Sequence, residues 1–219
     1  MTEFVDPQLF VDPLLILVLA INFVALGVSR IRGVINAVAF QGCLLGVFPM
    51  FVHSELGLRG LFLMAGTIAL KGFVIPGFLL RAMRAAEIQH EDKPVISYMA
   101  SLLLGAVGTG LALEFSSTLP LAKEHTQMLV VPAALATVWT GFLMLTTRHK
   151  AIMQVLGYLL LENGIFIFGL LLLEDLPLLV ELGVLLDLFT GVFVMVIIIH
   201  HLNREFSSTS TAHLTSLKE

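Results

Sequence analysis

Long apolar segments separated by short polar ones make up nearly the whole chain. Seven of these segments have roughly the 20 residues that a helix needs to cross the hydrocarbon core of a bilayer. They cover residues 13–29, 34–52, 60–80, 95–115, 128–147, 152–173 and 178–201. None shows the two-residue alternation that is typical of an outer-membrane barrel strand. The pattern therefore predicts an all-α integral membrane protein, a bundle of about seven transmembrane helices.

The positive charges lie mainly on one side of this predicted bundle. If the connecting segments alternate between the two sides, only Arg59 and Lys123 fall on one of them, and Lys71 lies inside the third apolar segment. The other side carries Arg30, Arg32, Arg81, Arg84, Lys93, Arg148, Lys150, Arg204 and Lys218. Because cytoplasmic loops are enriched in Lys and Arg, we expect an external N-terminus and a cytoplasmic C-terminus.

The composition excludes several classes of protein. Hydrophobic residues make up 58% of the chain and charged residues 13%, whereas a soluble domain has about 25% charged residues. With 16 acidic residues against 12 Lys and Arg, the chain cannot form the basic face that binds nucleic acid. The single Cys43 excludes an internal disulfide, and no Cys/His cluster has the spacing of a metal site. We expect no cofactor, no metal and no nucleic acid to bind this chain.

Three ionisable residues fall near the middle of predicted membrane helices, at a similar depth. They are Lys71 in the third segment, Glu162 in the sixth and Asp187 in the seventh. Such groups are costly in hydrocarbon, so they normally face the bundle interior and pair there. Burial disfavours their charged forms and neighbouring opposite charges favour them, so groups near that balance exchange protons readily. The set predicts proton-relay sites, and a static buried ion pair is the alternative.

Two further polar residues accompany this set. Asn163 directly follows Glu162, and Glu181 lies near the predicted external end of the seventh segment. The positive N-terminal end of a helix favours an anion such as Glu181. We interpret both residues as supporting a pathway for ions, although a simple first-turn carboxylate is the alternative for Glu181.

The third segment also contains signals for an irregular, closely packed helix. Pro76 lies five residues after Lys71 and removes the hydrogen bond to the carbonyl of Gly72. This predicts a kink beside the lysine. In the second segment, Gly42 and Gly46 form a GxxxG pattern, which predicts close contact with another helix.

Three stretches of the sequence resemble the hydrogenase-4 component E family. They are "QVLGYLLLENG" (154–164), "LLVELGVLLDLFTGVFVMVII" (178–198) and "LKGFVIP" (70–76), where the family also has a lysine five residues before a proline. The resemblance covers the chain end to end. It implies a non-redox membrane-arm subunit of a complex I-like assembly, in the typical case with a membrane-bound [NiFe]-hydrogenase module.

The last three predicted helices also resemble subunit K of complex I and the related small subunit of multisubunit sodium/proton antiporters. That subunit has a buried glutamate in each of its last two helices. Asp187, four residues before Gly191, falls on the acidic position of the last helix. In the preceding helix the alignment puts Leu159 on the family's glutamate, and Glu162 lies about one turn later.

The resemblance also implies an organisation and a location. Residues 1–127 would form an N-terminal four-helix region, residues 128–203 the three-helix region resembling subunit K, and residues 204–219 a cytoplasmic tail. The implied partners are antiporter-like membrane subunits and a hydrophilic iron–sulfur module, [NiFe]-hydrogenase-like in hydrogenase-linked members. The implied location is the inner membrane of a prokaryote, with no catalytic centre in this chain itself.

Three functional hypotheses follow. In the first, Glu162, Asp187 and Lys71 take part in proton or sodium translocation coupled to electron transfer in partner subunits. In the second, the chain is a purely structural scaffold that holds antiporter-like subunits together. The third is a stand-alone transporter or photoreceptor, but the sequence lacks the inverted repeats and paired broken helices typical of transporters.

Overall fold

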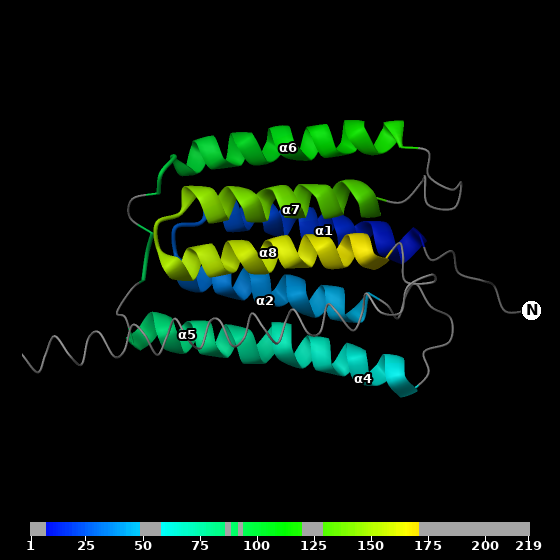
Figure 1. Cartoon of the computed structure of the whole chain (residues 1–219), viewed down its shortest axis with the longest axis horizontal. Coiled ribbons are helices and arrows are strands. Elements are labelled where there is room, and N and C mark those ends of the chain that lie inside the picture. Colours follow the sequence, from blue (N-terminus) through cyan, green and yellow to red (C-terminus); the bar gives the residue numbers. More distant parts are fainter. Residues whose placement is uncertain (1–7, 49–57, 86–88, 92–93, 120–128, 171–219) are drawn as a thin grey trace, which may run out of the picture.

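The described part of the chain is a bundle of helices that run roughly side by side (Figure 1). The computed structural model describes residues 8–48, 58–85, 89–91, 94–119 and 129–170. The elements are α1 (Gln8–Gly27), α2 (Ile31–Val47), α4 (Leu58–Thr67), the π-helix η1 (Ile68–Val74), α5 (Ile75–Ala85), α6 (Tyr98–Thr118), α7 (Val130–Thr147) and α8 (Ala151–Leu170).

These helices cover six of the seven predicted segments, and the seventh, 178–201, lies outside the described residues. Four stretches are long and apolar enough to cross a membrane, and α1 and α2 contain shorter apolar helices. The four are Met64–Arg84, Tyr98–Thr118, Val130–Thr147 and Ala151–Gly169. An all-helical protein compatible with a membrane is therefore confirmed. The number of seven helices, the orientation of the termini and the division near residue 127 stay predictions.

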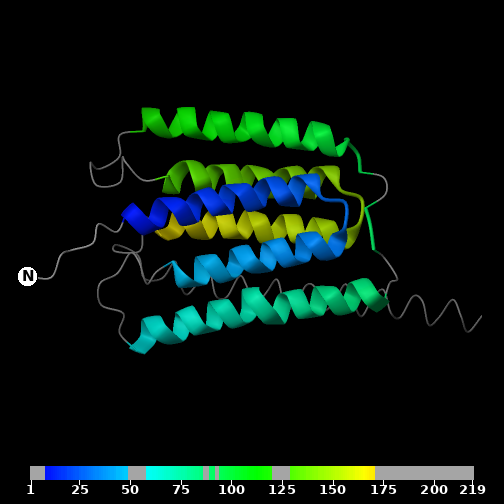
Figure 2. The same ribbon diagram turned by 180° about the vertical axis from the view of Figure 1, so that it is seen from behind.

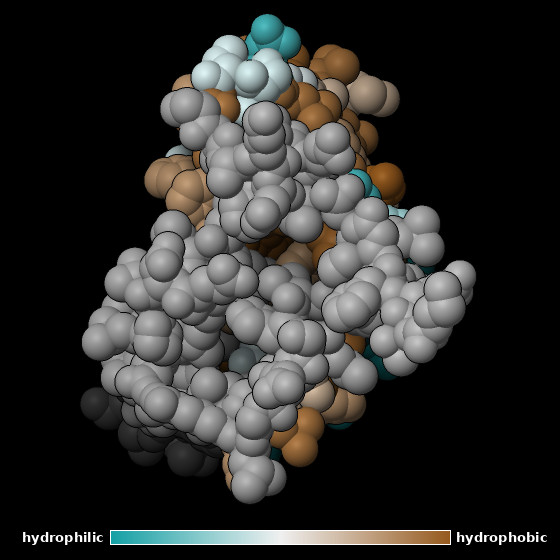
Figure 3. All heavy atoms as spheres, turned by 90° about the vertical axis from the view of Figure 1, so that its right-hand side faces the viewer, coloured by the Kyte–Doolittle hydropathy of each residue, from teal (hydrophilic) through white to brown (hydrophobic). Residues whose placement is uncertain are grey.

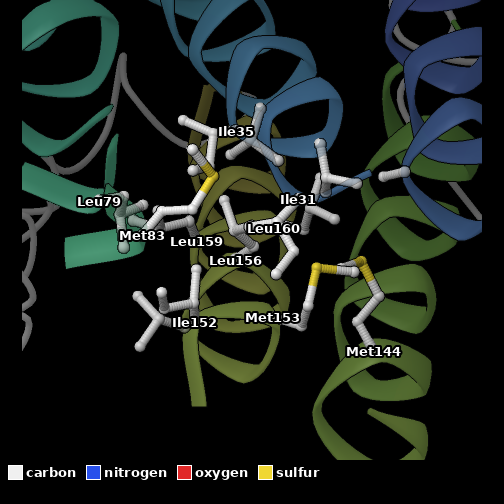
Figure 4. Packing of buried hydrophobic residues seen from close by; sticks show 14 of the residues in the cluster. Ile31, Ile35, Leu79, Met83, Met144, Ile152, Met153, Leu156, Leu159 and Leu160 are labelled. Carbon is white, nitrogen blue, oxygen red and sulfur yellow. The ribbon is translucent and has the colours of Figure 1, made fainter. Parts of the chain in front are cut away.

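The helices form a central group with one helix on either flank. α1, α2, α7 and α8 pack together in the centre, α6 lies against α7 and α1, and the continuous helix α4–η1–α5 lies against α2 (Figures 1 and 2). Apolar side chains of α2, α5, α7 and α8 fill the space between them (Figure 4). Those labelled there are Ile31, Ile35, Leu79, Met83, Met144, Ile152, Met153, Leu156, Leu159 and Leu160.

The interface between α7 and α8 is built on glycine. A Cβ atom on Gly141 of α7 would lie 2.5 Å from the backbone nitrogen of Leu161, and one on Gly164 of α8 would lie 2.6 Å from that of Val138. Gly157 of α8 lies in the same interface. Because backbone atoms cannot move aside as side chains do, the two helices are fixed against each other.

The outer faces of the flanking helices are apolar. Phe62 and Phe73 on the α4–η1–α5 side and Leu103 and Leu111 on α6 are largely exposed. Seen from the end where α6 finishes, the visible described atoms along the sides are mostly hydrophobic, and hydrophilic atoms gather at the tip of α6 (Figure 3). Extended exposed apolar surfaces mark contact with a membrane or a partner.

Candidate functional site

Lys71 lies in the π-helical segment η1, in the middle of the long helix that runs from α4 to α5. The segment ends at Val74, two residues before Pro76, which has no N–H to donate to the carbonyl of Gly72. The sequence predicts a kink beside the lysine, and the structure has a π-helical segment at this place. π-helical turns are rare and occur frequently at functional sites.

The glycines of α2 allow the π-helical segment to approach closely. A Cβ atom on Gly42 would lie 2.7 Å from the Cβ of Lys71, and one on Gly46 would lie 2.5 Å from Cγ1 of Ile68. The helix contact predicted from the GxxxG pattern is thus confirmed. Lys71 is only 7% exposed, so its ammonium group depends on partners inside the bundle.

Two groups on α8 stabilise that ammonium group. Lys71 Nζ donates a hydrogen bond to Oδ1 of Asn163 at 3.1 Å, and it lies 5.4 Å from the centre of the Phe166 ring. Asn163 and Phe166 are three residues apart, so both belong to one face of α8. An amide oxygen and the negative face of an aromatic ring each favour a cation.

The hydrogen bonds continue from Asn163 across the bundle. Asn163 Nδ2 donates to Oε1 of Gln41 on α2 at 3.1 Å. Gln41 Nε2 donates to Oδ1 of Asn22 on α1 at 3.0 Å, and Asn22 Nδ2 donates to Oγ1 of Thr137 on α7 at 2.8 Å. All of these residues are buried. We call the line Lys71–Asn163–Gln41–Asn22–Thr137 the amide chain.

Every donor in the amide chain points away from Lys71. The line ends where the Thr137 hydroxyl donates to the carbonyl of Ala133 at 2.7 Å. Each amide therefore presents its oxygen toward the lysine, and aligned hydrogen bonds polarise one another. The acceptor end of the amide chain therefore lies at the Lys71 ammonium group.

Glu162 is the second buried ionisable residue of the site. It is 3% exposed and directly precedes Asn163 on α8.

A small cavity lies beside the lysine. Lys71, Pro76 and Asn163 line this cavity of about 10 Å³, whose other walls are apolar side chains of α2, α5 and α8. That volume is close to the smallest that holds one water molecule.

The other predicted site residues, Asp187, Glu181 and Gly191, lie outside the described residues. Of the predicted set, the structure therefore brings together Lys71 and Asn163, and it places Pro76 beside them. Within the described ranges no group of three or more His, Cys, Asp and Glu side chains is arranged to hold a metal ion.

Sequence reasoning missed Asn22, Gln41 and Thr137. A signal for two of them exists, because Asn22 and Gln41 are amides in long apolar segments, where polar side chains hydrogen-bond between helices. Asn36 of the same α2 helix gives an equal signal but is exposed. Composition alone therefore does not identify the members of the amide chain.

A second polar region lies at one end of the bundle, where the connections α1–α2, α5–α6 and α7–α8 meet (left in Figure 1). Glu91 N donates to the carbonyl of Ser29 at 3.0 Å, and Val95 N donates to that of Thr147 at 2.8 Å. Described cations of the predicted cytoplasmic side gather at this end, which we call the arginine-rich end. By the bounds of the helices, they are Arg30, Arg32, Arg81, Arg84, Arg148 and Lys150.

The buried Glu91 carboxylate holds the start of α8. Its Oε1 accepts a hydrogen bond from the backbone N–H of His149 at 3.0 Å, and its Oε2 accepts one from Lys150 at 3.3 Å. These amides precede the first residue of α8, Ala151. A carboxylate at a helix N-terminus satisfies free amides and complements the helix dipole.

Arg148, 1% exposed, joins the same connections from the other side. Its Nη2 donates to the carbonyl of Leu26 at 2.7 Å, and its guanidinium lies 4.6 Å from the centre of the Tyr98 ring. The Tyr98 hydroxyl donates to the carbonyl of Glu91 at 2.7 Å. Burial lowers the pKa of Arg148, and the neighbouring Tyr98 and Glu91 oppose that shift.

Comparison with known proteins finds relatives by sequence. No family model and no solved structure matches the chain. Over 100 residues it is 33% identical to hydrogenase-4 component E of Escherichia coli K12, a match that spans 46% of this chain and 45% of that protein. The same protein from Shigella flexneri matches equally. With the membrane helices, this relationship supports a membrane location.

A longer match is found in Mycobacterium tuberculosis. The protein named "Uncharacterized protein Rv0085" is 33% identical over 194 residues, which span 86% of this chain and 87% of that one. The chain belongs to the same family as this mycobacterial protein.

Proposed function

We propose that this protein is a non-redox membrane-arm subunit of a complex I-like, hydrogenase-linked assembly in a prokaryotic inner membrane. Its buried charges take part in proton or sodium translocation that is driven by electron transfer in partner subunits. The observation that carries the proposal is Lys71, a buried lysine in a π-helical turn that is hydrogen-bonded to the residue after the buried Glu162.

The match to hydrogenase-4 component E supports the type of assembly. Because this match spans about half of each chain, the partner subunits are part of what we propose. They are antiporter-like membrane subunits and an iron–sulfur module of [NiFe]-hydrogenase type.

The geometry supports a switchable charge at Lys71. The ammonium is held by a side-chain amide and an aromatic ring, and it borders a cavity with room for about one water molecule. An ion that arrives near Lys71 interacts electrostatically with its ammonium group. The aligned hydrogen bonds of the amide chain polarise in response, and this polarisation extends across α8, α2, α1 and α7. Asp187 extends this line of charges in the proposal, in keeping with the resemblance to subunit K.

One observation favours the second function, a structural scaffold. The amide chain joins five helical segments with hydrogen bonds between buried groups, and such bonds hold membrane helices together. The two functions predict different results when the buried charges are neutralised. The first predicts loss of ion translocation, and the second predicts loss of assembly of the complex.

The first experiment tests the assembly. The full chain carries an affinity tag and is purified from its native membranes in a mild detergent, and co-purifying proteins are identified by mass spectrometry. We expect antiporter-like subunits and an iron–sulfur protein. Recovery of a monodisperse chain without them contradicts the proposal and favours a stand-alone transporter.

The second experiment tests the charges. Glu162→Gln and Asp187→Asn are each introduced into the native complex, and ion uptake driven by electron transfer is measured in membrane vesicles. We expect an intact complex with impaired uptake. Glu114→Gln on α6, an exposed carboxylate, is the matched control. Unchanged uptake in an assembled variant contradicts the relay role, and loss of assembly favours the scaffold.

A further inference from the structure

A cleft of about 660 Å³ opens at the arginine-rich end, between the start of α2 and the end of α5. Its polar lining consists of Arg30, Arg32, Arg84, Gln89 and His90. We propose that this cleft binds the phosphate-bearing headgroup of an anionic phospholipid. The proposal is independent of the ion-translocating function.

The backbone brings these cations together from separate parts of the chain. Arg30 is the extended residue before α2, and its backbone pairs with that of His90. Ile31 N donates to the carbonyl of Gln89 at 3.1 Å. These bonds fix the segment that carries Gln89 and His90 against the start of α2, while Arg84 comes from the last turn of α5. The cationic lining is therefore built by the fold.

The described part of the structure gives these arginines no acidic partner. None of the described residues that line the cleft carries a carboxylate. The nearest described acid along the chain, Glu91, uses both oxygens on the amides of His149 and Lys150. Arg84 donates Nε to the carbonyl of Leu80 at 3.3 Å, which leaves its two terminal nitrogens for another acceptor.

The helix ends make an anion more favourable still. Arg30 and Arg32 stand at the N-terminus of α2, whose first turn contains no acidic residue. The N-terminal end of a helix carries partial positive charge, so cations there are unfavourable and an anion is stabilised. An anion in the cleft contacts the arginines and relieves this repulsion.

Apolar surface beside the cleft favours a lipid over a soluble phosphate. Leu80 and Met83 of α5 form part of the wall, and Leu80 lies one turn before Arg84. Phe73, two turns before Leu80, is 70% exposed. An acyl chain therefore has apolar surface along this helix below the headgroup. Basic pockets at the cytoplasmic ends of membrane helices are typical sites for anionic headgroups.

The test measures binding of defined lipids to the full chain, purified with any partners that accompany it. Phosphatidylglycerol, phosphatidylcholine and inorganic phosphate are titrated separately, and bound lipid is counted by native mass spectrometry. We expect phosphatidylglycerol to bind and the other two to bind much more weakly. Equal binding of phosphatidylcholine, or of inorganic phosphate, overturns the assignment to an anionic lipid.

Variants test whether the cleft is the site. Arg32→Gln and Arg84→Gln are each expected to weaken phosphatidylglycerol binding about fivefold, the contribution of one arginine near a membrane surface. Arg81→Gln is the matched control, because Arg81 is exposed on α5 and does not line the cleft. Circular dichroism verifies that each variant is folded. If Arg81→Gln weakens binding as much as the cleft variants, the site is not the cleft.

Discussion

The two polar regions of the molecule hold buried charges in different ways. In the middle of the bundle, Lys71 donates to a side-chain amide that belongs to a line of side chains. At the arginine-rich end, Arg148 donates to the carbonyl of Leu26, and Glu91 accepts from backbone amides. Side-chain partners rotate about their own bonds, whereas backbone partners move only with their helix or loop. The first arrangement suits a charge that changes state, and the second suits a permanent link between connections.

The type of hydrogen-bond partner distinguishes a buried charge with a functional role from one with a structural role, and burial alone does not. Lys71, Arg148 and Glu91 are all buried, so burial alone makes each a candidate for a functional site. The identity of the hydrogen-bond partners distinguishes them. Variants of the two regions should therefore differ in which measurement they change.

The largest effect on stability is expected from Arg148→Met. The substitution removes the hydrogen bond from the guanidinium to the carbonyl of Leu26 and the contact with the Tyr98 ring. Orphaning a buried polar group costs about 1–3 kcal/mol, and more where the lost partner is charged. Thermal unfolding in detergent measures the loss. Arg81→Met is the control at the same end, with an expected change within about 0.5 kcal/mol because the side chain is exposed. Equal stabilities of the two variants would show that Arg148 does not stabilise the fold.

Lys71→Met is expected to act on function more than on stability. It removes a charge and leaves Oδ1 of Asn163 without its donor, at a cost of about 1–3 kcal/mol. We expect ion uptake by the native complex to fall at least about tenfold, the effect of a 1.4 kcal/mol change, while the complex still assembles. Native gel electrophoresis and vesicle uptake measure the two quantities. A stable complex with full uptake would place Lys71 with the architectural charges.

Gln41→Leu interrupts the middle of the amide chain. Both neighbours lose a partner, and we expect a loss of stability of about 1–3 kcal/mol. Asn36→Leu, an exposed amide on the same helix, is the control. Because replacing partners together is less costly than orphaning one, Gln41→Leu with Asn22→Leu should destabilise less than the sum of the single changes. Additive losses would show that the chain is not one unit.

The smallest effect is expected at Thr137, the end of the amide chain furthest from Lys71. Thr137→Val removes the hydroxyl that accepts from Asn22 and donates to the carbonyl of Ala133. Only Asn22 loses a side-chain partner, whereas Gln41→Leu deprives two residues of theirs, and hydrogen bonds between membrane helices contribute about 0.6 kcal/mol on average. Thermal unfolding should therefore shift only slightly. A loss as large as that of Gln41→Leu would mean that the chain is not weakest at its end.

Local signals in the sequence predict much of the fold and part of the site. Apolar length predicts the described helices, and Pro76 after Lys71 predicts the irregular helix between α4 and α5. Asn163, expected to support the site because it follows Glu162, is the acceptor for Lys71. The partners Gln41 and Asn22 were not predictable, because each hydrogen bond joins helices whose relative rotation depends on packing. The role of Glu91 was hidden for the same reason, since it contacts a loop 58 residues further along the chain.

The glycine contacts between α7 and α8 have a mechanical consequence. With backbone against backbone, these two helices form one stiff body, and a change at Asn163 cannot be absorbed by sliding between them. Lys71 itself belongs to η1, whose widened turns depart from regular α-helical geometry. We therefore expect a displacement at the lysine to be taken up within the α4–η1–α5 flank and not between α7 and α8.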